Sequence, residues 1–478
     1  MSFGPCERAA LAALALAAIL TWALVPTYPD YDAYHHLLWG RDLLDGAKPG
    51  FETFAAPTQH PLYVGVCALL SLAGDGADRL LVLLTILSLV ALIAGSYALG
   101  RELFGVWPAA LGALFVGSSF AFLLYAVRAF VDVPFLALVV WAAALEAATP
   151  RRGLAPMALL ATAGLLRPEA WILAGVYWLW CLPGSALRER LELLALVLIA
   201  PAAWALVDWA VTGDPLFSLH GTQQLAELLE RERGVEHVPS AFVTFLADVA
   251  RPPVALAGAI GIVVAVRRFG PARMAVPVAL LGAGALTFVA TGIAGLSIIQ
   301  RYLTVPAVAL CVLAGYALLG FTTLERGPRR TCWRAAALGG LVVGVAFLAL
   351  KAASFGRLAD ELRFIRATHG ELQTLLDGAS VRTTLSCGAL TFPTYRLVPD
   401  ARWMLDASSA EVRSRAEDPR RGGIAVYIDA TSRADDAAKF ARRFGRADGV
   451  SRRTNEPPRS KPDLRSGPFS VYVARRCP

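Results

Sequence analysis

Long apolar runs alternate with short charged segments along most of the chain. Several of these runs have about 18 or more nearly uncharged residues, which is the length of helix needed to cross the hydrocarbon core of a bilayer. The pattern predicts an all-α polytopic membrane protein with about eleven transmembrane helices. The predicted spans lie near residues 9–26, 79–100, 107–125, 131–148, 154–166, 169–182, 191–211, 252–266, 274–293, 298–320 and 335–352.

Four of the apolar runs need separate interpretation. The first resembles a signal peptide, but Trp22, Leu24 and Pro26 do not form a small-residue cleavage site, so we expect it to be retained as a helix. The run 62–73 is too short to span easily and is expected to be re-entrant or juxtamembrane. The two short runs around Arg167 predict either a hairpin of two helices or one long broken helix.

The positive charges of the chain explain its orientation. The net charge is +8, yet the arginines lie in short connections between apolar runs and form no basic face, which argues against a nucleic-acid partner. With the N-terminus inside, the inside connections carry most of the arginines, as the positive-inside rule requires. These residues are Arg8, Arg101, Arg151, Arg152, Arg188, Arg190, Arg267, Arg268, Arg273, Arg326, Arg329, Arg330 and Arg334.

Three long polar regions then face outward, at residues 27–60, 212–251 and 353–478. We therefore predict a transmembrane domain over residues 1–352, with external loops 27–60 and 212–251, and an extracytoplasmic domain over residues 353–478. All six histidines fall in the three polar regions, as expected of a side chain that avoids hydrocarbon. No inside loop is long enough for a catalytic domain, and no glycine-rich phosphate motif is present, which argues against a nucleotide-sugar enzyme with a cytosolic Rossmann domain.

The C-terminal region predicts a small soluble α/β domain. Its pattern indicates an amphipathic helix at 357–376, strands at 424–428 and 469–474, and a helix near 434–444. Cys387 and Cys477 both fall in this region, where an exported and oxidising location would permit a disulfide. The other cysteines show no metal-ligand spacing.

The first external loop holds acidic residues at the start of a predicted helix. Asp32 shares a helix face with His35 and His36, three and four residues further on. A carboxylate there can act as a general base or hold a divalent cation. The alternative is that Asp30 or Asp32 only caps the helix, because a side-chain oxygen at that position accepts a hydrogen bond from an orphan N–H.

Ionisable residues also collect at one depth of the predicted membrane domain. Charged groups at the edge of spans are costly and usually face a polar cavity. Three of these residues are arginines, Arg128, Arg167 and Arg301. Because the geometry of a guanidinium group matches that of phosphate oxygens, we predict that these arginines hold a lipid phosphate. Two structural alternatives stay open: Arg167 and Glu169 as a local ion pair, and Arg301 as an interfacial anchor. The residues are Arg128, Asp132, Arg167, Glu169, Arg301 and Tyr302.

Several short motifs together resemble the GT-C superfamily of integral-membrane glycosyltransferases. These enzymes take sugars from polyprenyl-phosphate carriers and include protein mannosyltransferases, aminoarabinose transferases of lipid A and mycobacterial arabinosyltransferases. The resemblance covers about residues 9–320 and depends on the order of the motifs. The motifs are Asp30-Tyr31-Asp32-Ala33-Tyr34-His35-His36, Gly46, His60-Pro61-Leu62-Tyr63, Leu166-Arg167-Pro168-Glu169-Ala170, and Arg301-Tyr302-Leu303 with Pro306.

The resemblance implies an inverting glycosyltransferase of the plasma membrane with its active site on the extracytoplasmic side. It implies that a sugar moves from a polyprenyl-phosphate donor to a hydroxyl of a glycan, glycolipid or protein, with Asp32 or Asp30 as base. We prefer Asp32, although the commonest family pattern is Asp-Glu. The remaining implied roles are donor and substrate binding by Arg301, Tyr302, Arg167, Glu169, Arg128, Asp132, Tyr34 and His60, and a Mg²⁺ or Mn²⁺ site at Asp32, His35 and His36.

Two other function classes fit some of these features. A transporter or flippase for a lipid-linked or anionic substrate also has charged groups and broken helices near a cavity. No inverted repeat is visible, however, and the ionisable residues lie towards one face and not at the midplane. A polymerase or ligase of O-antigen type would place its histidine and arginines on a long late loop, whereas the long loops here are the first one and the one after Val211.

Overall fold

The structure is a computed structural model that describes residues 3–350, 356–385, 388–417, 423–429, 432, 437–444 and 455–474. Its contacts divide the chain into two compact units. The first, which we call the membrane unit, contains Met1–Val25, His60–Tyr63 and Val82–Leu358. The second, which we call the mixed unit, contains Pro26–Gln59, Val64–Leu81 and Ala359–Pro478.

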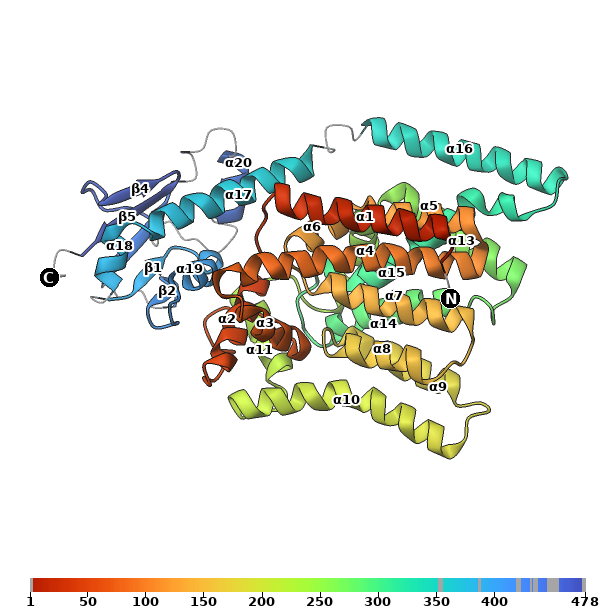
Figure 1. The fold of residues 1–478 in the computed structure, drawn as a ribbon, viewed down its shortest axis with the longest axis horizontal. Coiled ribbons are helices and arrows are strands. Elements are labelled where there is room, and N and C mark those ends of the chain that lie inside the picture. Colours follow the sequence, from red (N-terminus) through yellow and green to blue (C-terminus); the bar gives the residue numbers. More distant parts are fainter. Residues whose placement is uncertain are drawn as a thin grey trace. The chain divides into compact units, whose positions relative to one another are not determined.

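Each of the eleven predicted spans coincides with helical structure in the membrane unit. Its helices are α1 (Pro5–Leu24), α4 (Ala77–Phe104), α5 (Val106–Gly117), α6 (Phe120–Val127), α7 (Asp132–Ala148), α8 (Leu154–Gly164), α9 (Glu169–Cys181), α10 (Leu187–Thr212), α11 (Phe217–Leu228), α12 (Val238–Ala250), α13 (Pro252–Phe269), α14 (Ala275–Ile293), α15 (Thr304–Leu319) and α16 (Pro328–Leu350). The first five residues of α4 belong to the mixed unit. Figure 1 shows most of these helices running along a common direction.

Fewer helices are long enough to cross a membrane than the sequence predicts. Within the part of the chain that the structure describes, seven helices are long and apolar enough to cross a membrane, or eight if α5 and α6, bent by 57° at their junction, form one span. α8 and α9 have 11 and 13 residues, so they measure only about 16 and 20 Å and cannot cross the hydrocarbon core alone. The protein is a multi-pass membrane protein, and the count of eleven spans is not confirmed.

α8 and α9 form a hairpin and not one broken helix. The beginning of α8 lies beside the end of α9, because the Gly153 N–H donates to the Tyr177 hydroxyl over 3.0 Å. Nearby, Arg151 Nη1 donates to the Pro183 carbonyl over 3.4 Å. The turn of this hairpin contains Arg167.

Small residues allow α15 to occupy the centre of the membrane unit. Gly258 and Gly261 of α13 approach α15 so closely that an added Cβ would lie 2.5 Å from the Leu310 carbonyl oxygen and 2.3 Å from that of Leu313. Close backbone approach through small residues is the usual way in which helices pack in a membrane. α15 is accordingly the most buried of the candidate spans, with 83% of its apolar window inside the protein.

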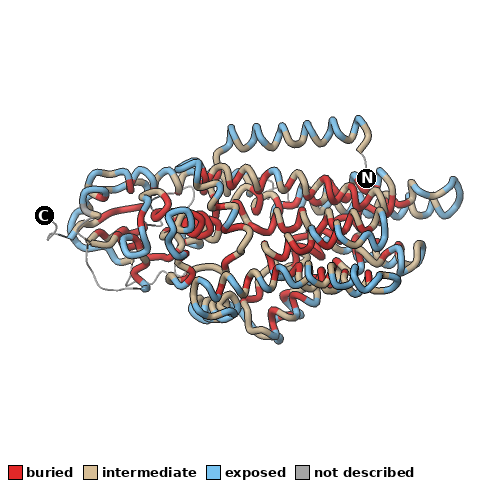
Figure 2. The backbone as a smooth tube through the Cα atoms, turned by 60° about the horizontal axis from the view of Figure 1, so that its bottom comes forward, coloured by how far each residue is buried: buried red, intermediate tan, exposed pale blue. Residues whose placement is uncertain are grey.

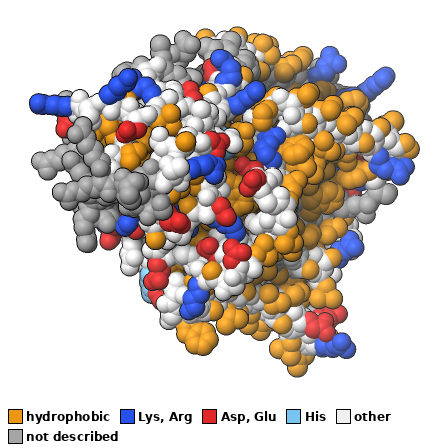
Figure 3. Space-filling view, turned by 60° about the vertical axis from the view of Figure 1, so that its left-hand side comes forward, with side chains coloured by type: hydrophobic (Ala, Val, Ile, Leu, Met, Phe, Trp, Pro, Cys, Tyr) orange, Lys and Arg blue, Asp and Glu red, His pale blue; other side chains and the backbone are white. Residues whose placement is uncertain are grey.

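Other helices of this unit have largely exposed apolar surfaces. Only 6% of the apolar window of α16 and none of that of α1 is buried, and Figure 2 shows α1, the helix that begins at the N mark, pale along its length. Figure 3 shows a broad continuous area of hydrophobic side chains on the molecular surface. Such surfaces are expected where lipid replaces water as the solvent.

The mixed unit combines helices near the N-terminus with a small α/β fold. Its five-stranded sheet has the order β2-β1-β3-β5-β4, with β1 parallel to β2 and β3 and the remaining pairs antiparallel. The elements are α2 (Tyr31–Leu44), most of α3 (Pro61–Ser71), α17 (Arg357–Leu376), α18 (Ala379–Thr384), β1 (Leu390–Phe392), α19 (Val398–Leu405), β2 (Val412–Ser414), β3 (Ile424–Ile428), α20 (Ala437–Phe444), β4 (Leu464–Ser466) and β5 (Phe469–Val473).

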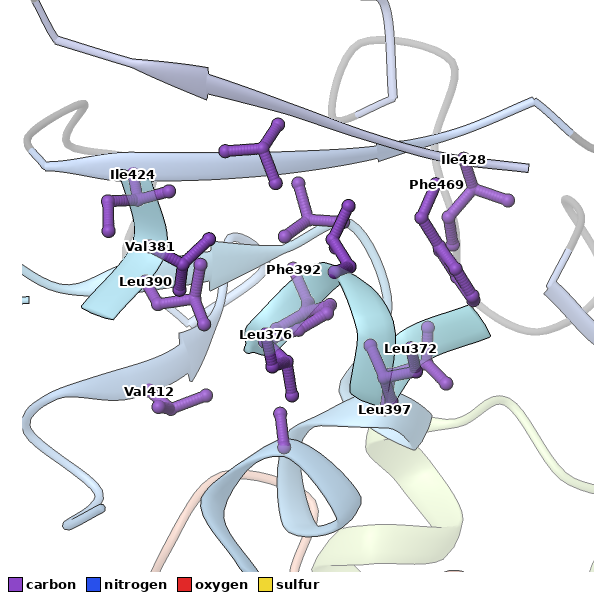
Figure 4. Close-up of a cluster of buried hydrophobic side chains, with 14 of the residues drawn as sticks. Leu372, Leu376, Val381, Leu390, Phe392, Leu397, Val412, Ile424, Ile428 and Phe469 are labelled. Carbon is purple, nitrogen blue, oxygen red and sulfur yellow. The ribbon is translucent and has the colours of Figure 1, made fainter. Parts of the chain in front are cut away.

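The core of this α/β fold lies between α17 and the sheet. Figure 4 shows Leu372 and Leu376 of α17 with Phe392 of β1 and Phe469 of β5 among the clustered apolar side chains. The predicted helix 357–376 and strand 424–428 match α17 and β3, and β5 ends one residue before the predicted limit of 474. Cys387 and Cys477 lie outside the described residues.

Candidate active site

The turn between α8 and α9 positions the first pair of charged side chains. Pro168 cannot continue α8, and Glu169 begins α9 directly after it. Within this turn the Arg167 guanidinium donates from Nε over 2.8 Å and from Nη2 over 2.5 Å, in both cases to Glu169 Oε1. The local ion pair considered from the sequence is therefore present.

Asp132, the first residue of α7, joins two distant arginines. Arg167 Nη1 donates to Asp132 Oδ1 over 2.5 Å, and Arg301 Nη1 lies 3.6 Å from Asp132 Oδ2. The Asp132 side chain is fully buried, whereas 23% of the Arg301 side chain is exposed. Arg301 is thus the arginine of this group with the most surface available to a ligand. We call Asp132, Arg167, Glu169 and Arg301 the charge cluster.

Two oxygens of the charge cluster lack a hydrogen-bond donor. Within the part of the chain that the structure describes, neither Asp132 Oδ2 nor Glu169 Oε2 accepts a hydrogen bond, and both atoms are buried. The formal charges of two arginines and two carboxylates cancel, which reduces the cost of their burial. Buried polar atoms without partners are rare in folded proteins and mark places where a polar ligand or water fits.

Aromatic side chains surround the two arginines. The Arg167 guanidinium lies 5.5 Å from the Tyr302 ring centre, and the Arg301 guanidinium lies 5.2 Å from that of Phe130. Tyr125 accepts a hydrogen bond of 3.0 Å from Gln300 Nε2, beside Arg301 in the chain. Tyr125 and Gln300 have no sequence signal of their own, and only their positions close to Arg128 and Arg301 in the chain could indicate them.

The short segment from His60 to Tyr63 ties together the two turns that carry the cluster. The Leu62 N–H donates to the Leu165 carbonyl over 3.2 Å, in the turn before Arg167. The Tyr63 hydroxyl donates to the Ala129 carbonyl over 2.6 Å, next to Arg128. The His60 ring lies edge-on to Trp204 at 5.5 Å. His60 and Arg128 are therefore near the cluster through backbone contacts of their neighbours.

In the mixed unit, the two acids of the first loop take different places on α2. Asp30 is the N-cap, since its Oδ1 accepts a hydrogen bond of 3.0 Å from the Ala33 N–H. Asp32 lies in the first turn and is half-buried. Tyr34 is fully buried and donates to Asp78 Oδ2 over 3.1 Å, which joins α2 to the start of α4.

The predicted cation site on α2 does not form. No group of three His, Cys, Asp or Glu side chains within the described ranges is arranged to hold a metal ion. The physical reason is local: His36 Nδ1 is 2.6 Å from the Asp32 carbonyl oxygen of its own helix, and the His35 ring packs edge-on against Tyr31 at 4.8 Å. These contacts turn both rings towards protein neighbours.

Contacts with the C-terminal region explain the shifted pKa of His35. Burial, together with the charge of Arg402 on α19, lowers the pKa of His35 to about 3, so its ring is neutral at pH 7. Burial also lowers the pKa of Arg402 and raises that of Asp42. Tyr31 packs against Tyr395 at 5.3 Å on the same side of α2. The helix that carries Asp32 therefore packs against residues of the C-terminal region.

Comparison with known proteins gives a match of fold without a match of sequence. No family model and no curated protein matches the chain. The crystal structure of ArnT from Cupriavidus metallidurans in the apo state is similar over 98% of both chains, with a TM-score of 0.54 and 14% identity.

Two structures of the Archaeoglobus fulgidus oligosaccharyltransferase are also similar. One is tethered with an acceptor peptide, with a TM-score of 0.45 and 14% identity. The other, AglB in complex with an inhibitory peptide and a dolichol-phosphate, has a TM-score of 0.47 and 12% identity. Each comparison covers 92% of this chain and 71% of the other. From its agreement with ArnT over nearly the whole length, we conclude that this chain has the same fold as ArnT, a membrane domain followed by a small C-terminal domain, as the sequence resemblance led us to expect.

Proposed function

We propose that the protein is an inverting glycosyltransferase that moves a sugar from a polyprenyl-phosphate donor to a hydroxyl of an extracytoplasmic glycan, glycolipid or protein. The observation that carries this proposal is the charge cluster, in which a partly exposed arginine lies 3.6 Å from Asp132 Oδ2 and two buried carboxylate oxygens, Asp132 Oδ2 and Glu169 Oε2, accept no hydrogen bond within the described residues. A sugar phosphate supplies both complementary parts, an anion for the arginine and hydroxyl donors for the carboxylates.

The four side chains of the charge cluster have different roles in this proposal. Arg301 contacts the donor phosphate and stabilises the charge that develops on it as the glycosidic bond breaks. Arg167 is held by Asp132 and Glu169 and acts as a positioning residue, because its Nε, Nη1 and Nη2 all donate to carboxylates. Asp132 Oδ2 and Glu169 Oε2 accept hydrogen bonds from sugar hydroxyls.

Asp32 is the proposed general base. The cap hydrogen bond of Asp30 leaves Asp32 as the acid of the first turn whose carboxylate is not used to begin the helix. In the reaction Asp32 accepts the proton of the acceptor hydroxyl as the oxygen forms a bond to the anomeric carbon. The anomeric carbon–oxygen bond breaks, and its electron pair leaves with the polyprenyl phosphate. Because the residues of α2 do not fit a metal site, no step of this mechanism passes through a cation.

The test is to incubate the purified protein with a panel of polyprenyl-phosphate sugars and to measure released polyprenyl phosphate. We expect Asp32→Asn to reduce turnover by about 10²–10⁴-fold, the usual contribution of general base catalysis. Asp30→Asn should reduce it far less. Asp45→Asn, at the exposed C-cap of the same helix, is the matched control.

Two results would contradict the proposal. Full turnover in both the Asp32 and Asp30 variants would remove the proposed base. Transfer of the intact lipid-linked sugar across a vesicle membrane, without release of polyprenyl phosphate, would indicate the flippase alternative.

A further inference from the structure

A large cavity lies in the membrane unit and extends along α7 and α9 to the ends of these helices that are remote from the charge cluster. It has a volume of about 420 Å³ and is bounded by α7, α8, α9 and the first half of α14. Its walls are almost entirely apolar and include Val139, Leu160, Leu173, Val176 and Ala279. Apolar cavities stay dry and bind apolar molecules. A hydrocarbon chain is therefore the ligand that its walls favour.

Glu146 is the one carboxylate in the cavity wall, and its hydrogen bonds are used within the protein. Its oxygens accept hydrogen bonds from the Tyr177 hydroxyl at 2.9 Å, from Trp180 Nε1 at 2.7 Å and from the Arg151 N–H at 2.7 Å. The Glu146 residue is only 5% exposed. Glu146 therefore fixes the loop after α7. Because its oxygens already accept these hydrogen bonds, Glu146 does not need a polar group of a ligand as a partner.

Two exposed arginines lie at the end of the cavity where Glu146 is located, in the loop between α7 and α8. Arg151 and Arg152 follow α7 and are exposed, and the Arg151 guanidinium lies 5.0 Å from the ring centre of Trp180, a lining residue. Glu146 is 14 residues from Asp132 on α7, which places this end about 21 Å from the charge cluster. Basic pockets between membrane helices bind anionic lipid headgroups.

We propose that this cavity binds one acyl chain of an anionic glycerophospholipid, with the headgroup at Arg151 and Arg152. The volume and the apolar walls supply the chain site, and the two exposed arginines supply the charge complementarity. By the arginine bias of the sequence, the lipid comes from the inner leaflet. The inference does not depend on the proposed transferase activity, because it uses none of the residues assigned to that reaction.

The experiment measures lipid binding to the delipidated full-length protein in detergent by native mass spectrometry. The probes are phosphatidylglycerol, phosphatidylcholine with the same acyl chains, and a polyprenyl phosphate. We expect tighter binding of phosphatidylglycerol than of phosphatidylcholine. Arg152→Gln should weaken phosphatidylglycerol binding about fivefold, as expected for one arginine near a headgroup, and leave phosphatidylcholine unchanged.

Matched variants separate the chain site from non-specific lipid contact. Ala279→Phe fills the cavity and should weaken the binding of both phospholipids, and Val176→Phe fills it from α9 if the first variant does not fold. Ala12→Phe on the exposed surface of α1 and Arg188→Gln, whose side chain is 89% exposed, should behave as wild type.

Three outcomes would overturn the proposal. The first is equal affinity of the wild type for the two phospholipids. The second is unchanged phosphatidylglycerol binding in both cavity variants. The third is binding of polyprenyl phosphate in preference to phosphatidylglycerol that is lost in Ala279→Phe, which would identify the cavity as a donor-chain site.

Discussion

At the scale of single residues, the sequence predicts local pairs well and distant pairs poorly. Arg167 and Glu169 are two positions apart around a proline, so their ion pair could be anticipated. Asp132 lies 35 residues before Arg167, and nothing in its local sequence names that partner. The unpaired oxygens of the charge cluster depend on rotamers and burial, which a sequence pattern does not contain.

Replacement of Arg167 should cost more stability than replacement of Arg301. Arg167→Met leaves two buried carboxylates without their main partner and should destabilise the protein by about 3–5 kcal/mol. Arg301→Met removes a longer contact of 3.6 Å from a partly exposed side chain and should cost less. Thermal unfolding in detergent measures both, with Arg188→Met as the exposed control. Equal losses for the two variants would contradict the proposed division between a positioning and a ligand-contacting arginine.

His35 should make the protein less stable in acid. Its pKa is about 3 when folded and near 6.5 when unfolded, so the unfolded state binds the proton more readily and stability falls as the pH drops below 6.5. The expected loss between pH 7 and pH 5 is about 2 kcal/mol.

Unfolding of wild type and His35→Asn at several pH values tests this. The variant should lose less stability in this pH window, whereas His237→Asn, whose ring is 46% exposed, should follow the wild type. The same pH slope in His35→Asn and wild type would refute the assignment.

At the scale of secondary-structure elements, apolar runs identify helices but not the depth to which each enters the membrane. Every predicted span coincides with a helix, yet α8 is half the length of a span. The bend between α5 and α6 occurs at two serines, which gave no signal because serine is common inside membrane helices. A local pattern also does not show where two helix backbones approach each other closely, and α2 and α3 provide a testable case.

Gly40 sets the distance between α2 and α3. A Cβ added there would lie 2.4 Å from the Ala68 backbone nitrogen, so Gly40→Ala must push the two helices apart. We expect a loss of about 1–3 kcal/mol, the usual cost of overpacking. Gly65→Ala on α3 is the control, because nothing lies within 4 Å of its added Cβ. A Gly40→Ala variant as stable as wild type in thermal unfolding would show that the helices are free to separate.

At the scale of the whole molecule, the sequence predicts a helical membrane domain and a small α/β domain, but it does not show which segments of the chain belong to each compact unit. The first loop was expected to belong with the transmembrane domain. In the structure, 26–59 packs in one unit with the C-terminal region, through Arg41 with Asp406 and Trp403. Partners more than 300 residues apart leave no trace in local periodicity. The boundary between domains at residue 352 stays a prediction.

Sided labelling tests the predicted orientation. Cys6 and Cys332 are exposed and predicted inside, so in a variant with serine at positions 387 and 477 a membrane-impermeant maleimide should react only after permeabilisation. Adding Asp45→Cys should give a site that reacts from outside in intact cells. Reaction of this added cysteine only in permeabilised cells would reverse the topology and remove the extracytoplasmic active site.

The charge cluster also has a consequence for how the chain is made. Synthesis adds roughly 5–20 residues per second, so several seconds separate the synthesis of Asp132 from that of its partner Arg167, 35 residues later. During that interval α7 presents an unpaired acid to the insertion machinery, at a cost below the roughly 2.5–3.5 kcal/mol of an acid at a helix centre, because Asp132 is the first residue of α7. The helices α7, α8 and α9 should therefore leave the translocon together. In arrested nascent chains that end before Arg167, α7 should remain accessible to protease.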